Sequence, residues 1–483
     1  MAMNFATMMA ALPTGNWIGG KWVDSVDRLA VHDPGNGSLL AEISRADVAT
    51  CLQAVDAAST AFGSWRGAAP RARAEILRRA YDLMVAEADL IAELIVCENG
   101  KVLIDARNET IYAAEFFRWF SEEAVRLDGD LRRAPGGANW IAVARQPVGV
   151  ALLLSPWNFP AAMLARKIGP ALAAGCTVVL KPAAETPLTA IYLVDLLHRA
   201  GVPAGVVNLV IPDPPGPAVA AMIGHGAIRK LSFTGSTPVG KLLLTQAAQR
   251  VVNCSMELGG NAPFVVLADA DIDAAIEGAM IAKMRNGGAA CTAANRFIVD
   301  NAVADEFAEK LSTRMASLVV GYGLDPSAQV GALITQAQQV RVNGLVERAI
   351  DEGAKLVGRG TAPGGGWFVA PVVLDHVSPD SELFAAEVFG PVAPIYRVDG
   401  DDEALRLANN VEHGLVGYVY TRDVGRGMRF SQAIEAGMVG LNRGLVSDPA
   451  APFGGMKESG LGREGGHEGL LAFTETQYVS VAW

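Results

Sequence analysis

The sequence is poor in cysteine, and its few cysteines lie far apart. The 483 residues include five of them, without any C-x-x-C pair: Cys51, Cys97, Cys176, Cys254 and Cys291. An odd number at scattered positions argues against a disulfide framework and against a zinc site. We therefore expect no bound metal and a protein that works in a reducing compartment, the cytoplasm.

The chain also lacks an excess of positive charge. Its 40 Lys and Arg residues are outnumbered by 51 Asp and Glu residues, which gives a formal net charge of -11. Nucleic acid and acidic membranes are therefore not expected as partners, and an anionic ligand must be held by a few local cations. No stretch reaches the roughly eighteen consecutive apolar residues of a membrane span, and the apolar N-terminus has no basic leader. We expect a soluble protein.

The chain is long enough for more than one domain, and 51 % of its residues are hydrophobic. Apolar residues three or four apart predict long surface helices over 46–65 and 70–100, with a solvated basic face that includes Arg71, Arg73, Arg78 and Arg79. From Pro147, short runs of branched and aliphatic residues alternate with helical segments. Strands are predicted over 148–155, 177–182, 206–211 and 230–236, with helices at 161–174 and 187–199 and near 218. This β-α-β order is typical of a parallel sheet with crossover helices.

A second α/β series begins near Glu257. Its predicted strands lie at 256–267, 296–300, 391–398, 414–421 and 438–442, and its predicted helices at 271–284, 302–318 and 402–410. Two further segments, 139–149 and 475–483, alternate like strands but have no partner in either core. We expect them to project and to pair elsewhere, including in another subunit. The predicted fold class is α/β, with two parallel-sheet domains and a small β element.

Cys291 lies in the most open of the cysteine environments, the stretch "NGGAACTAANR" at 286–296. A thiolate nucleophile needs access, a route for its proton and donors for the oxyanion that forms on attack. The glycines and alanines before Cys291 leave room for a substrate. The alternative is a small apolar residue in a tight turn, since free cysteine is often buried.

Two other short motifs carry groups that could work beside a thiolate. In "MELGGNAP", Glu257 lies between a predicted strand and two glycines, where it could swing between water and a buried site as a general base. In "SPWNFP", Asn158 follows a predicted strand, and its amide could donate to a developing oxyanion. The alternatives are an exposed turn glutamate and an asparagine that closes a turn.

Taken together, the motifs resemble a known superfamily. "SPWNFP", "TVVLKP", "FTGSTPVG", "MELGGNAP", "NGGAACTAANR", "EVFGPV" and "PFGGMKESGLGREGG" have the order and spacing of the NAD(P)-dependent aldehyde dehydrogenases. The resemblance runs from "NWIGGKW" to the end of the chain. Within the superfamily, "RKIGPALAAGCTVVLKP" and "GLVSDPAAPFGG" are similar to the succinate-semialdehyde dehydrogenase group.

The resemblance implies a role for each of these residues. Cys291 would attack the aldehyde, and the Asn158 side chain and the Cys291 backbone N–H would hold the oxyanion of the thiohemiacetal. After hydride transfer to the nicotinamide, Glu257 would activate the water that hydrolyses the thioester. A remote alternative is a relative that has lost catalysis and serves as a structural or binding protein.

The resemblance also implies a cofactor site for NAD or NADP on the first α/β domain. Gly235 and Gly240 of "GSTPVG" open a helix, where Ser236 and free backbone N–H groups could meet the pyrophosphate. Lys181 would contact the adenosine ribose, Glu387 the nicotinamide ribose, and Phe389 the nicotinamide ring. Ser155, Trp157 and Ala184 would lie at neighbouring positions of the cofactor site.

The residues that follow Lys181 do not decide between NAD and NADP. Relatives that prefer NAD usually carry a glutamate three positions after this lysine, where the chain has Ala184. The missing carboxylate removes a repulsion against a 2'-phosphate, although Glu185, one place later, could partly restore it.

Two arginines point to the substrate. Arg166 lies eight residues after Asn158, and Arg285 lies six residues before Cys291. A buried guanidinium without an anion costs several kcal/mol, and in the succinate-semialdehyde group the matching arginines and a serine at the place of Ser447 grip the substrate carboxylate. We expect a small aldehyde that carries a carboxylate, succinate semialdehyde first and glutarate semialdehyde second. In the alternative, each arginine pairs with a protein acid such as Glu115 or covers a helix end.

The resemblance finally implies a division of the chain and an assembly. We assign residues 1–130 and 148–256 to a Rossmann-like nucleotide-binding domain, 257–459 to the catalytic domain, and 131–147 with 460–483 to an oligomerisation element. This element would extend a sheet across subunits and give a homodimer or homotetramer.

Overall fold

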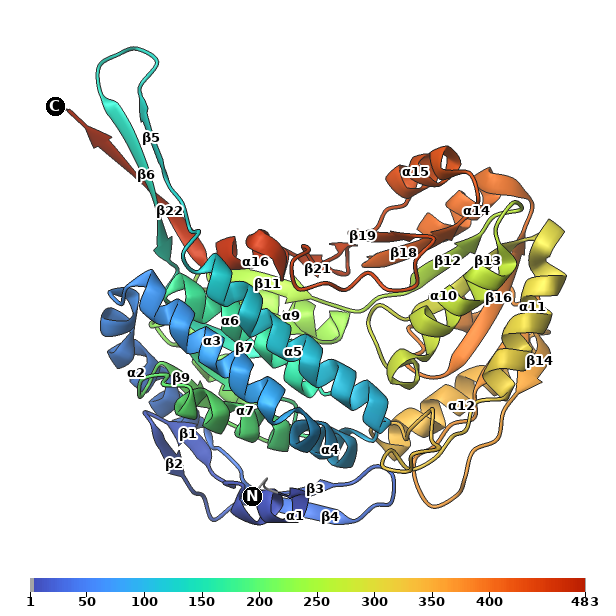
Figure 1. Ribbon diagram of the computed structural model, residues 1–483, viewed down its shortest axis with the longest axis horizontal. Helices are drawn as coiled ribbons and strands as arrows, with labels where there is room; N and C mark the ends of the chain where they lie inside the picture. Colours follow the sequence, from blue (N-terminus) through green and yellow to red (C-terminus); the bar gives the residue numbers. More distant parts are fainter. Residues whose placement is uncertain (1–3, 483) are drawn as a thin grey trace.

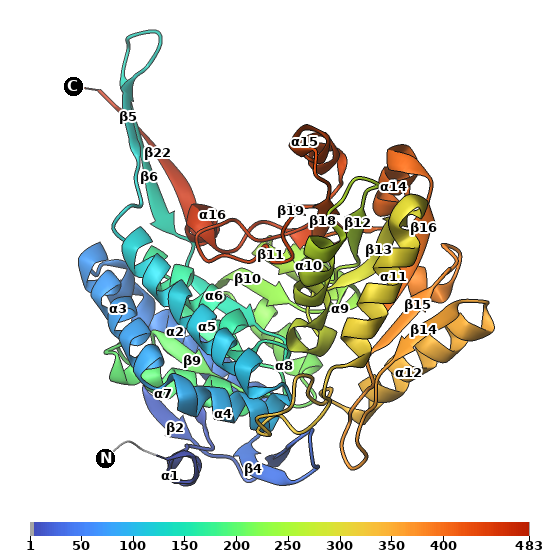
Figure 2. The same ribbon diagram turned by 45° about the vertical axis from the view of Figure 1, so that its right-hand side comes forward.

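The computed structural model describes residues 4–482. Two α/β regions lie side by side, and a narrow three-stranded sheet projects from one of them (Figures 1 and 2). None of the helices in the described part of the chain is long and apolar enough to cross a membrane. The arrangement agrees with the predicted α/β class.

The first large sheet has eight strands in the order β2-β1-β9-β8-β7-β10-β11-β21. Its five central strands are parallel, and antiparallel pairs close both ends. The strands are β1 (Asn16–Ile18), β2 (Lys21–Val23), β7 (Val150–Leu154), β8 (Thr177–Lys181), β9 (Val207–Leu209), β10 (Ile228–Thr234), β11 (Asn253–Glu257) and β21 (Gly460–Leu461).

Helices cover both faces of this sheet, and the central strand β7 shows why. All five of its residues are buried; Val150, Leu152 and Leu154 belong to one core, while Ala151 and Leu153 belong to the other. Alternate residues of a strand point to opposite faces, so a strand covered on both sides is apolar throughout. The core around Leu152 includes α2 (Val48–Arg66), α8 (Gly216–Gly224) and α9 (Thr237–Ala248), and the core around Leu153 includes α3 (Pro70–Ala86), α4 (Ala88–Asn99), α5 (Leu103–Glu123), α6 (Pro160–Ala174) and α7 (Pro187–Arg199).

The prediction of a continuous surface helix over 70–100 was wrong. The helical run divides at Glu87 into α3 and α4, and α4 is largely buried, with Ile91 and Leu94 both fully enclosed. Arg73 does not belong to a solvated face either, since it is 5 % exposed and its Nε donates to the carbonyl oxygen of Ala173 at 3.0 Å. Periodicity identifies the apolar side of a helix, but only tertiary packing decides whether the other side is also covered.

The second large sheet has seven strands in the order β14-β15-β16-β13-β12-β18-β19, all parallel except for β14. The strands are β12 (Ala262–Val266), β13 (Ala294–Asp300), β14 (Lys355–Arg359), β15 (Val372–Asp375), β16 (Val392–Val398), β18 (Val416–Tyr420) and β19 (Met438–Leu441). The helices of this region are α10 (Ile272–Met284), α11 (Asn301–Ala316), α12 (Gln336–Asp351), α13 (Glu382–Ala385), α14 (Gly400–Asn409) and α15 (Val424–Ala433).

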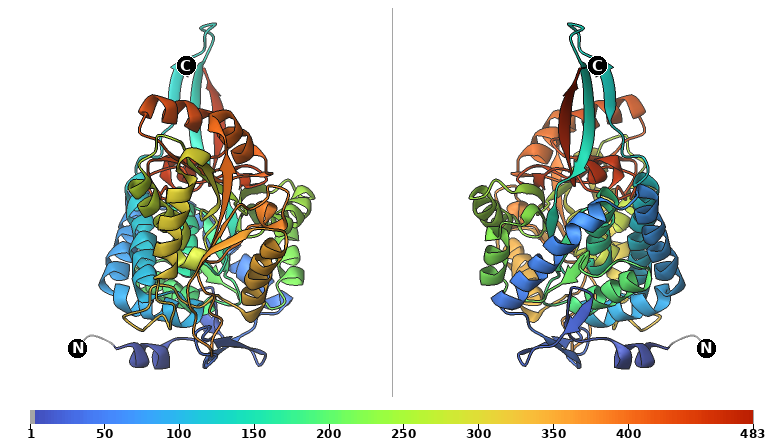
Figure 3. Two further views of the ribbon diagram at one scale, coloured as in Figure 1. Left: turned by 90° about the vertical axis from the view of Figure 1, so that its right-hand side faces the viewer. Right: turned by 90° about the vertical axis from the view of Figure 1, so that its left-hand side faces the viewer.

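The projecting sheet has the order β22-β6-β5 and consists of β5 (Asp130–Arg133), β6 (Trp140–Pro147) and β22 (Thr474–Val481). It lies at the opposite end of the molecule from α1 (Phe5–Ala11) (Figures 1 and 3). The antiparallel pairing of β6 with β22 joins the two segments that have no partner in either core. The remaining elements are the pairs β3 (Arg28–His32) with β4 (Leu39–Ser44) and β17 (His413–Gly414) with β20 (Met456–Lys457), the short helix α16 (Gly466–Leu471) and the turn η1 (Arg285–Gly288).

Candidate active site

Residues from both α/β regions line one cavity, with about 790 Å³ of empty space that is partly open to solvent. From the first region come the segments that follow β7 and β10, and from the second come the loops that precede β12, β13 and β16. The lining residues are Pro156, Trp157, Asn158, Met163, Thr234, Gly235, Ser236, Leu258, Gly259, Cys291, Gln338, Arg341, Glu387 and Phe389. We call this cavity the channel.

The channel contains five of the nine residues predicted to bind the cofactor: Trp157, Gly235, Ser236, Glu387 and Phe389. The Trp157 and Phe389 rings meet edge to face, with centroids 5.4 Å apart. Glu387 accepts a hydrogen bond from the Gly260 N–H at 3.0 Å, and burial raises the pKa of Glu387 to about 7. The channel therefore brings apolar rings and a poised carboxyl group close to Cys291.

The other four predicted cofactor residues lie outside the channel lining. Ser155 is buried directly after β7, and Lys181 ends the neighbouring strand β8, with Ala184 three residues later. Gly240 lies within α9, and its N–H is bonded to the carbonyl oxygen of Ser236 at 3.0 Å. A Cβ at Gly240 would lie 2.4 Å from Leu258, so this glycine permits close packing of α9 and has no free N–H for a phosphate.

Sequence reasoning missed Gln338 and Arg341, which come from α12 and line the channel. Gln338 Nε2 donates to the carbonyl oxygen of Phe389 at 3.0 Å, and Arg341 Nη2 donates to that of Glu387 at 2.7 Å. They fix the loop that carries Glu387 and Phe389. No sequence motif surrounds them, because side-chain to backbone bonds across 46 to 51 residues leave no local pattern.

Cys291 lies in a strained loop, three residues before the start of β13. Asn286 and Gly287 both have left-handed backbone conformations, with φ of 55° and 58°. A Cβ at Gly260 would lie 2.2 Å from the Cys291 carbonyl oxygen, so only glycine permits this approach. Cys291 is partly exposed as a whole residue, although its thiol is largely desolvated. Desolvation raises the pKa of Cys291 to about 12, while the charges of Arg166 and Arg285 oppose the rise.

Asn158 points to the same loop. Its Nδ2 donates to the Ala289 carbonyl oxygen at 3.2 Å, two residues before Cys291, and the side chain also lines the channel. Asn158 is 4 % exposed. Asn158 and Cys291 therefore line the same cavity, and the amide is a donor of the kind that can stabilise an oxyanion.

Glu257 ends β11 and is buried behind the channel, with both carboxyl oxygens unpartnered. Burial and the neighbouring Glu464 raise its pKa well above the ordinary range. A Cβ at Gly454 would lie 2.8 Å from the Glu257 carboxyl group, so this glycine leaves space for the carboxyl group. Glu464 in turn accepts a hydrogen bond from Lys167 Nζ at 2.5 Å.

A second, smaller cavity, with about 260 Å³ of empty space that is partly open to solvent, also reaches Cys291. It contains the three predicted substrate residues Arg166, Arg285 and Ser447, together with Tyr112, Phe159, Met163, Thr292 and Phe453. We call it the arginine cavity. Because Cys291 and Met163 line both cavities, the channel and the arginine cavity meet at the thiol.

Arg166 has no acidic partner in this cavity. Its Nη2 donates to the Tyr112 hydroxyl at 2.6 Å, its Cζ lies 3.9 Å from the centre of the Phe453 ring, and its buried Nε has no partner. Glu115 pairs with Arg118 instead, so the proposed pairing of Arg166 with Glu115 is not found. Arg285 Nη2 donates to Thr292 Oγ1 at 3.2 Å.

Within residues 4–482, no group of three His, Cys, Asp or Glu side chains is arranged to hold a metal ion. The polar groups that line the two cavities instead include a thiol, an amide, a carboxyl group and guanidinium groups, and the unpartnered carboxyl group of Glu257 is buried outside both linings. This set fits nucleophilic attack on a carbonyl group.

Comparison with known families identifies the group to which these features belong. The sequence profile of the aldehyde dehydrogenase family matches residues 22–479. The chain belongs to the aldehyde dehydrogenase family. The predicted superfamily is thus confirmed.

Several similar curated proteins are dehydrogenases named after a particular aldehyde. A succinate-semialdehyde dehydrogenase of Paenarthrobacter nicotinovorans is 50% identical, over 92% of this chain and 99% of that protein. A glutarate-semialdehyde dehydrogenase of Pseudomonas putida is 42% identical, over 96% and 97%. A 3-sulfolactaldehyde dehydrogenase of Pseudomonas putida is 44% identical, over 96% of each chain.

Solved structures confirm the fold. An NADP-dependent enzyme of Escherichia coli has a TM-score of 0.96 at 42% identity and covers 98% of each chain. An aldehyde dehydrogenase of Bacillus cereus in complex with NAD+ also has a TM-score of 0.96, at 33% identity, over 100% of this chain and 99% of that one.

Proposed function

We propose that the protein oxidises succinate semialdehyde to succinate, with NAD or NADP as the hydride acceptor. The observation that carries the proposal is Arg166, which is 2 % exposed, makes no ion pair within residues 4–482 and lines a cavity that reaches Cys291. A buried guanidinium is stabilised by an anion, and here the substrate carboxylate would supply it. Arg285 and Ser447 line the same cavity and would share this carboxylate.

The substrate class is supported by the relatives. Succinate and glutarate semialdehydes carry a carboxylate, and 3-sulfolactaldehyde carries a sulfonate, so all three substrate names combine an aldehyde with an anionic group. Chain length must place the aldehyde carbon at Cys291 while the anion stays at the arginines. Glutarate semialdehyde, one carbon longer, is the second candidate, and another small aldehyde is the third.

The chemistry begins at Cys291. Its thiolate sulfur forms a bond to the aldehyde carbon, and the electron pair of the carbonyl bond moves to the oxygen. The Asn158 amide and the Cys291 backbone N–H would donate to this oxyanion. Arg166 and Arg285 oppose the burial that raises the pKa of the thiol, and Glu257 would help to remove its proton.

NAD or NADP, when bound, supplies the acceptor for the hydride of the adduct, which leaves a thioester on Cys291. Glu257 would then take a proton from a water molecule that attacks the thioester carbon, and the Cys291 sulfur would leave with its electron pair as the carboxylic acid forms. Glu257 would have to move toward the thiol to do this, and the missing side chain at Gly454 leaves the place of its carboxyl group unblocked.

The residues of the first region fit a dinucleotide. Ser155 Oγ and Thr234 Oγ1 are buried without a partner, and the N-cap residue Ser236 makes no side-chain cap bond at the start of α9. A helix N-terminus without a cap can hold a pyrophosphate. Lys181 and Glu387 would contact the two riboses, and Trp157 and Phe389 would border the nicotinamide. Ala184 leaves no carboxylate against a 2'-phosphate, so both NAD and NADP fit the proposal.

The arginine cavity provides the test. Arg166→Ala and Arg285→Ala should each raise KM for succinate semialdehyde by about 10-fold to 100-fold, because a charge-assisted contact is worth about 1.5–3 kcal/mol. Butanal, of the same length but neutral, should be oxidised with nearly unchanged KM. Arg118→Ala is the matched control, since Arg118 is 46 % exposed and pairs with Glu115 outside the cavity. The proposal is wrong if both cavity variants keep the wild-type KM for succinate semialdehyde.

A further inference from the structure

A buried hydrogen-bond network joins the segment that carries Asn158 to the loop that carries Cys291. The Asn158 carbonyl oxygen accepts two hydrogen bonds, from Lys101 Nζ at 2.7 Å and from Asn286 Nδ2 at 2.8 Å. A carbonyl oxygen has two lone pairs, so both are used. The peptide group after Asn158 is therefore held in one orientation.

Asn286 also contacts the loop that carries Cys291. Its Nδ2 donates to the Ala289 carbonyl oxygen at 2.9 Å, and the Asn158 Nδ2 donates to the same oxygen at 3.2 Å. One amide group thus bonds the backbone of Asn158 and the backbone two residues before Cys291. The distance between the Asn158 side chain and the Cys291 backbone N–H depends on this bridge.

Asn286 is itself fixed by α5. Its backbone N–H donates to Asp105 Oδ2 at 2.8 Å, and its φ of 55° lies in the left-handed region that asparagine tolerates better than most residues. Asn286 is 5 % exposed and lines neither the channel nor the arginine cavity. A strained, buried polar residue beside a reactive group indicates a function beyond packing.

Lys101 also fixes the Asn158 segment, through its hydrogen bond to the Asn158 carbonyl oxygen. The Lys101 and Glu109 side chains are 1 % and 0 % exposed, and they pair at 2.5 Å. Glu109 Oε1 accepts the N–H groups of Ala161 and Ala162 at 2.9 Å and 3.2 Å, in the first turn of α6. Lys101 and Glu109 therefore anchor the Asn158 segment to α5, and Asn286 connects that segment to the thiol loop.

We infer that Asn286 is a positioning residue that sets the geometry of the two oxyanion donors, the Asn158 amide and the Cys291 backbone N–H. The inference rests on the proposed function, because Asn286 acts through groups whose roles belong to that proposal. Loss of an oxyanion donor costs about 10²-fold to 10³-fold in kcat, and misplacement by about 1 Å can cost about 10²-fold.

The test compares Asn286→Gly, Asn158→Ala and the double variant. Glycine adopts a φ of 55° without strain, so Asn286→Gly removes only the bridge. We expect kcat for succinate semialdehyde to fall by about 10-fold to 100-fold, with little change in KM. The double variant should lose less than the product of the two single losses, because part of the effect of the bridge passes through the Asn158 amide. Losses that multiply would overturn the inference.

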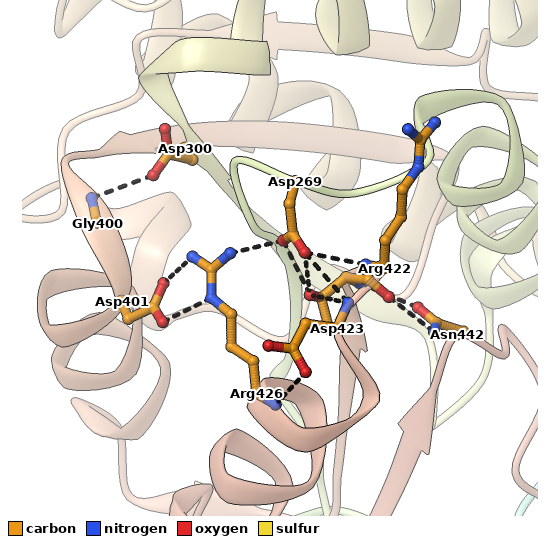
Figure 4. Close-up of polar contacts among 9 residues, drawn as sticks. Asp269, Asp300, Gly400, Asp401, Arg422, Asp423, Arg426 and Asn442 are labelled. Atoms are coloured by element: carbon orange, nitrogen blue, oxygen red, sulfur yellow. Dashed lines mark hydrogen bonds and ion pairs between the residues drawn. The ribbon is translucent and has the colours of Figure 1, made fainter.

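Asn442→Gly is the matched control. Asn442 has a φ of 50°, and its side chain bonds the backbone of Thr421 in both directions (Figure 4). Asn442 lines neither the channel nor the arginine cavity. The same substitution at the same backbone conformation should therefore leave kcat unchanged. Equal losses of kcat in Asn286→Gly and Asn442→Gly would contradict a specific role for Asn286.

Alkylation by iodoacetamide separates donor geometry from damage to the thiol. This reaction displaces iodide and forms no oxyanion at a carbonyl carbon, so Cys291 should react at the wild-type rate in Asn286→Gly. A slowed alkylation would show that the loop has collapsed and would overturn the inference. If Asn286→Gly does not fold, Asn286→Asp replaces it, since an ionised carboxylate has the same shape but no donor; wild-type kcat in that variant would contradict the bridge.

The two proposals fail in different ways. If Asn158→Ala retains wild-type kcat, the proposed oxyanion role fails, and the inference fails with it. If Asn158→Ala loses activity but Asn286→Gly does not, only the positioning role is wrong.

Discussion

The two large sheets present opposite edges to the site. The first sheet offers the carboxyl ends of β7, β10 and β11, where Asn158, Gly235 and Glu257 lie. The second sheet offers the segments before its strands, with Cys291 before β13 and Glu387 before β16. Ligands of open α/β sheets usually lie at the carboxyl edge. The first sheet follows this rule, and the second does not.

The carboxyl edge of the second sheet is filled by ion pairs. Arg426, at the start of α15, donates from Nη1 to Asp269 at 2.6 Å and from Nε to Asp401 at 2.7 Å (Figure 4). Asp269 also accepts from the Thr421 hydroxyl at 2.8 Å. The edge that binds a ligand in other sheets is here tied together by the protein's own charges. Under the proposed function, the first sheet serves binding and the second supplies the nucleophile.

The largest effect is expected where the second sheet meets the site. Cys291→Ala should lower aldehyde oxidation by about 10⁴-fold or more, because the covalent step needs the thiol. Nucleotide binding should persist, since the proposed cofactor residues lie mainly on the first sheet. Steady-state rates and fluorescence titration with NAD and NADP measure both. Substantial turnover without the thiol would remove Cys291 as the nucleophile.

Glu257→Gln should separate the two halves of the reaction. Acylation of Cys291 should proceed and give a burst of reduced nucleotide, while the later steady-state rate falls by about 10²-fold or more. Stopped-flow absorbance measures both phases, and equal loss of burst and steady state would contradict the deacylation role.

The same variant tests the pH dependence. Burial and Glu464 raise the pKa of Glu257, and only its ionised form can accept a proton from water. The wild-type deacylation rate should therefore rise with pH well above the ordinary range for a glutamate, and Glu257→Gln should lose this rise. A wild-type rate that is flat across this range would count against Glu257 as the base.

The projecting sheet β22-β6-β5 is separate from both large sheets. Leu131 and Tyr478, on its outer strands, are 59% and 57% exposed. Because open strand edges are normally covered, we predict a homodimer or homotetramer through this sheet. Light scattering should give about two or four times the 50.6 kDa of the chain. A monomer at working concentration would refute the assembly.

The smallest effect on activity is expected at the carboxyl edge of the second sheet. Arg426→Ala should lower the free energy of unfolding by about 1–2 kcal/mol, because the lost ion pairs are only partly screened by solvent. The activity per folded molecule should not change. Thermal denaturation measures the loss, and Arg422→Ala, with a side chain 69 % exposed, is the control with little effect. A loss of kcat in Arg426→Ala would show that this edge also serves catalysis.

Acid should reduce the difference in stability between the wild-type protein and Arg426→Ala. Burial favours the protonated form of Asp269, but the hydrogen bonds of Thr421 and Asp423 and the charge of Arg426 hold its pKa below the usual range. A lowered carboxyl pKa stabilises the folded state above the unfolded pKa, and this stabilisation is lost as pH falls through the folded value. The effect of Arg426→Ala should be complete at neutral pH and should shrink below about pH 4.

Much of the fold could be predicted, because local apolar runs and glycine or proline boundaries define it. The helix predicted over 187–199 is α7 (Pro187–Arg199), and the strand over 177–182 is β8 (Thr177–Lys181). The buried position of α4 could not be predicted, because it depends on α5 and α7, which pack against it.

Some residues of the candidate site could likewise be predicted from the sequence, and others could not. Cys291, Arg166, Arg285 and Ser447 lie in recognisable motifs, and the structure places all four around one cavity. Tyr112, Lys101 and Asn286 each share a hydrogen bond with a residue that is 54, 57 and 128 positions away, respectively. Such bonds leave no periodic pattern in the sequence, so only the fold reveals them.

The central claim is that the arginine cavity selects an aldehyde with a carboxylate. The most direct measurement is kcat/KM of the wild-type enzyme for succinate semialdehyde and for butanal, each with NAD and with NADP. We predict a preference for succinate semialdehyde of about 10²-fold or more, from the contacts of its carboxylate with Arg166 and Arg285. An equal or higher kcat/KM for butanal would contradict the account.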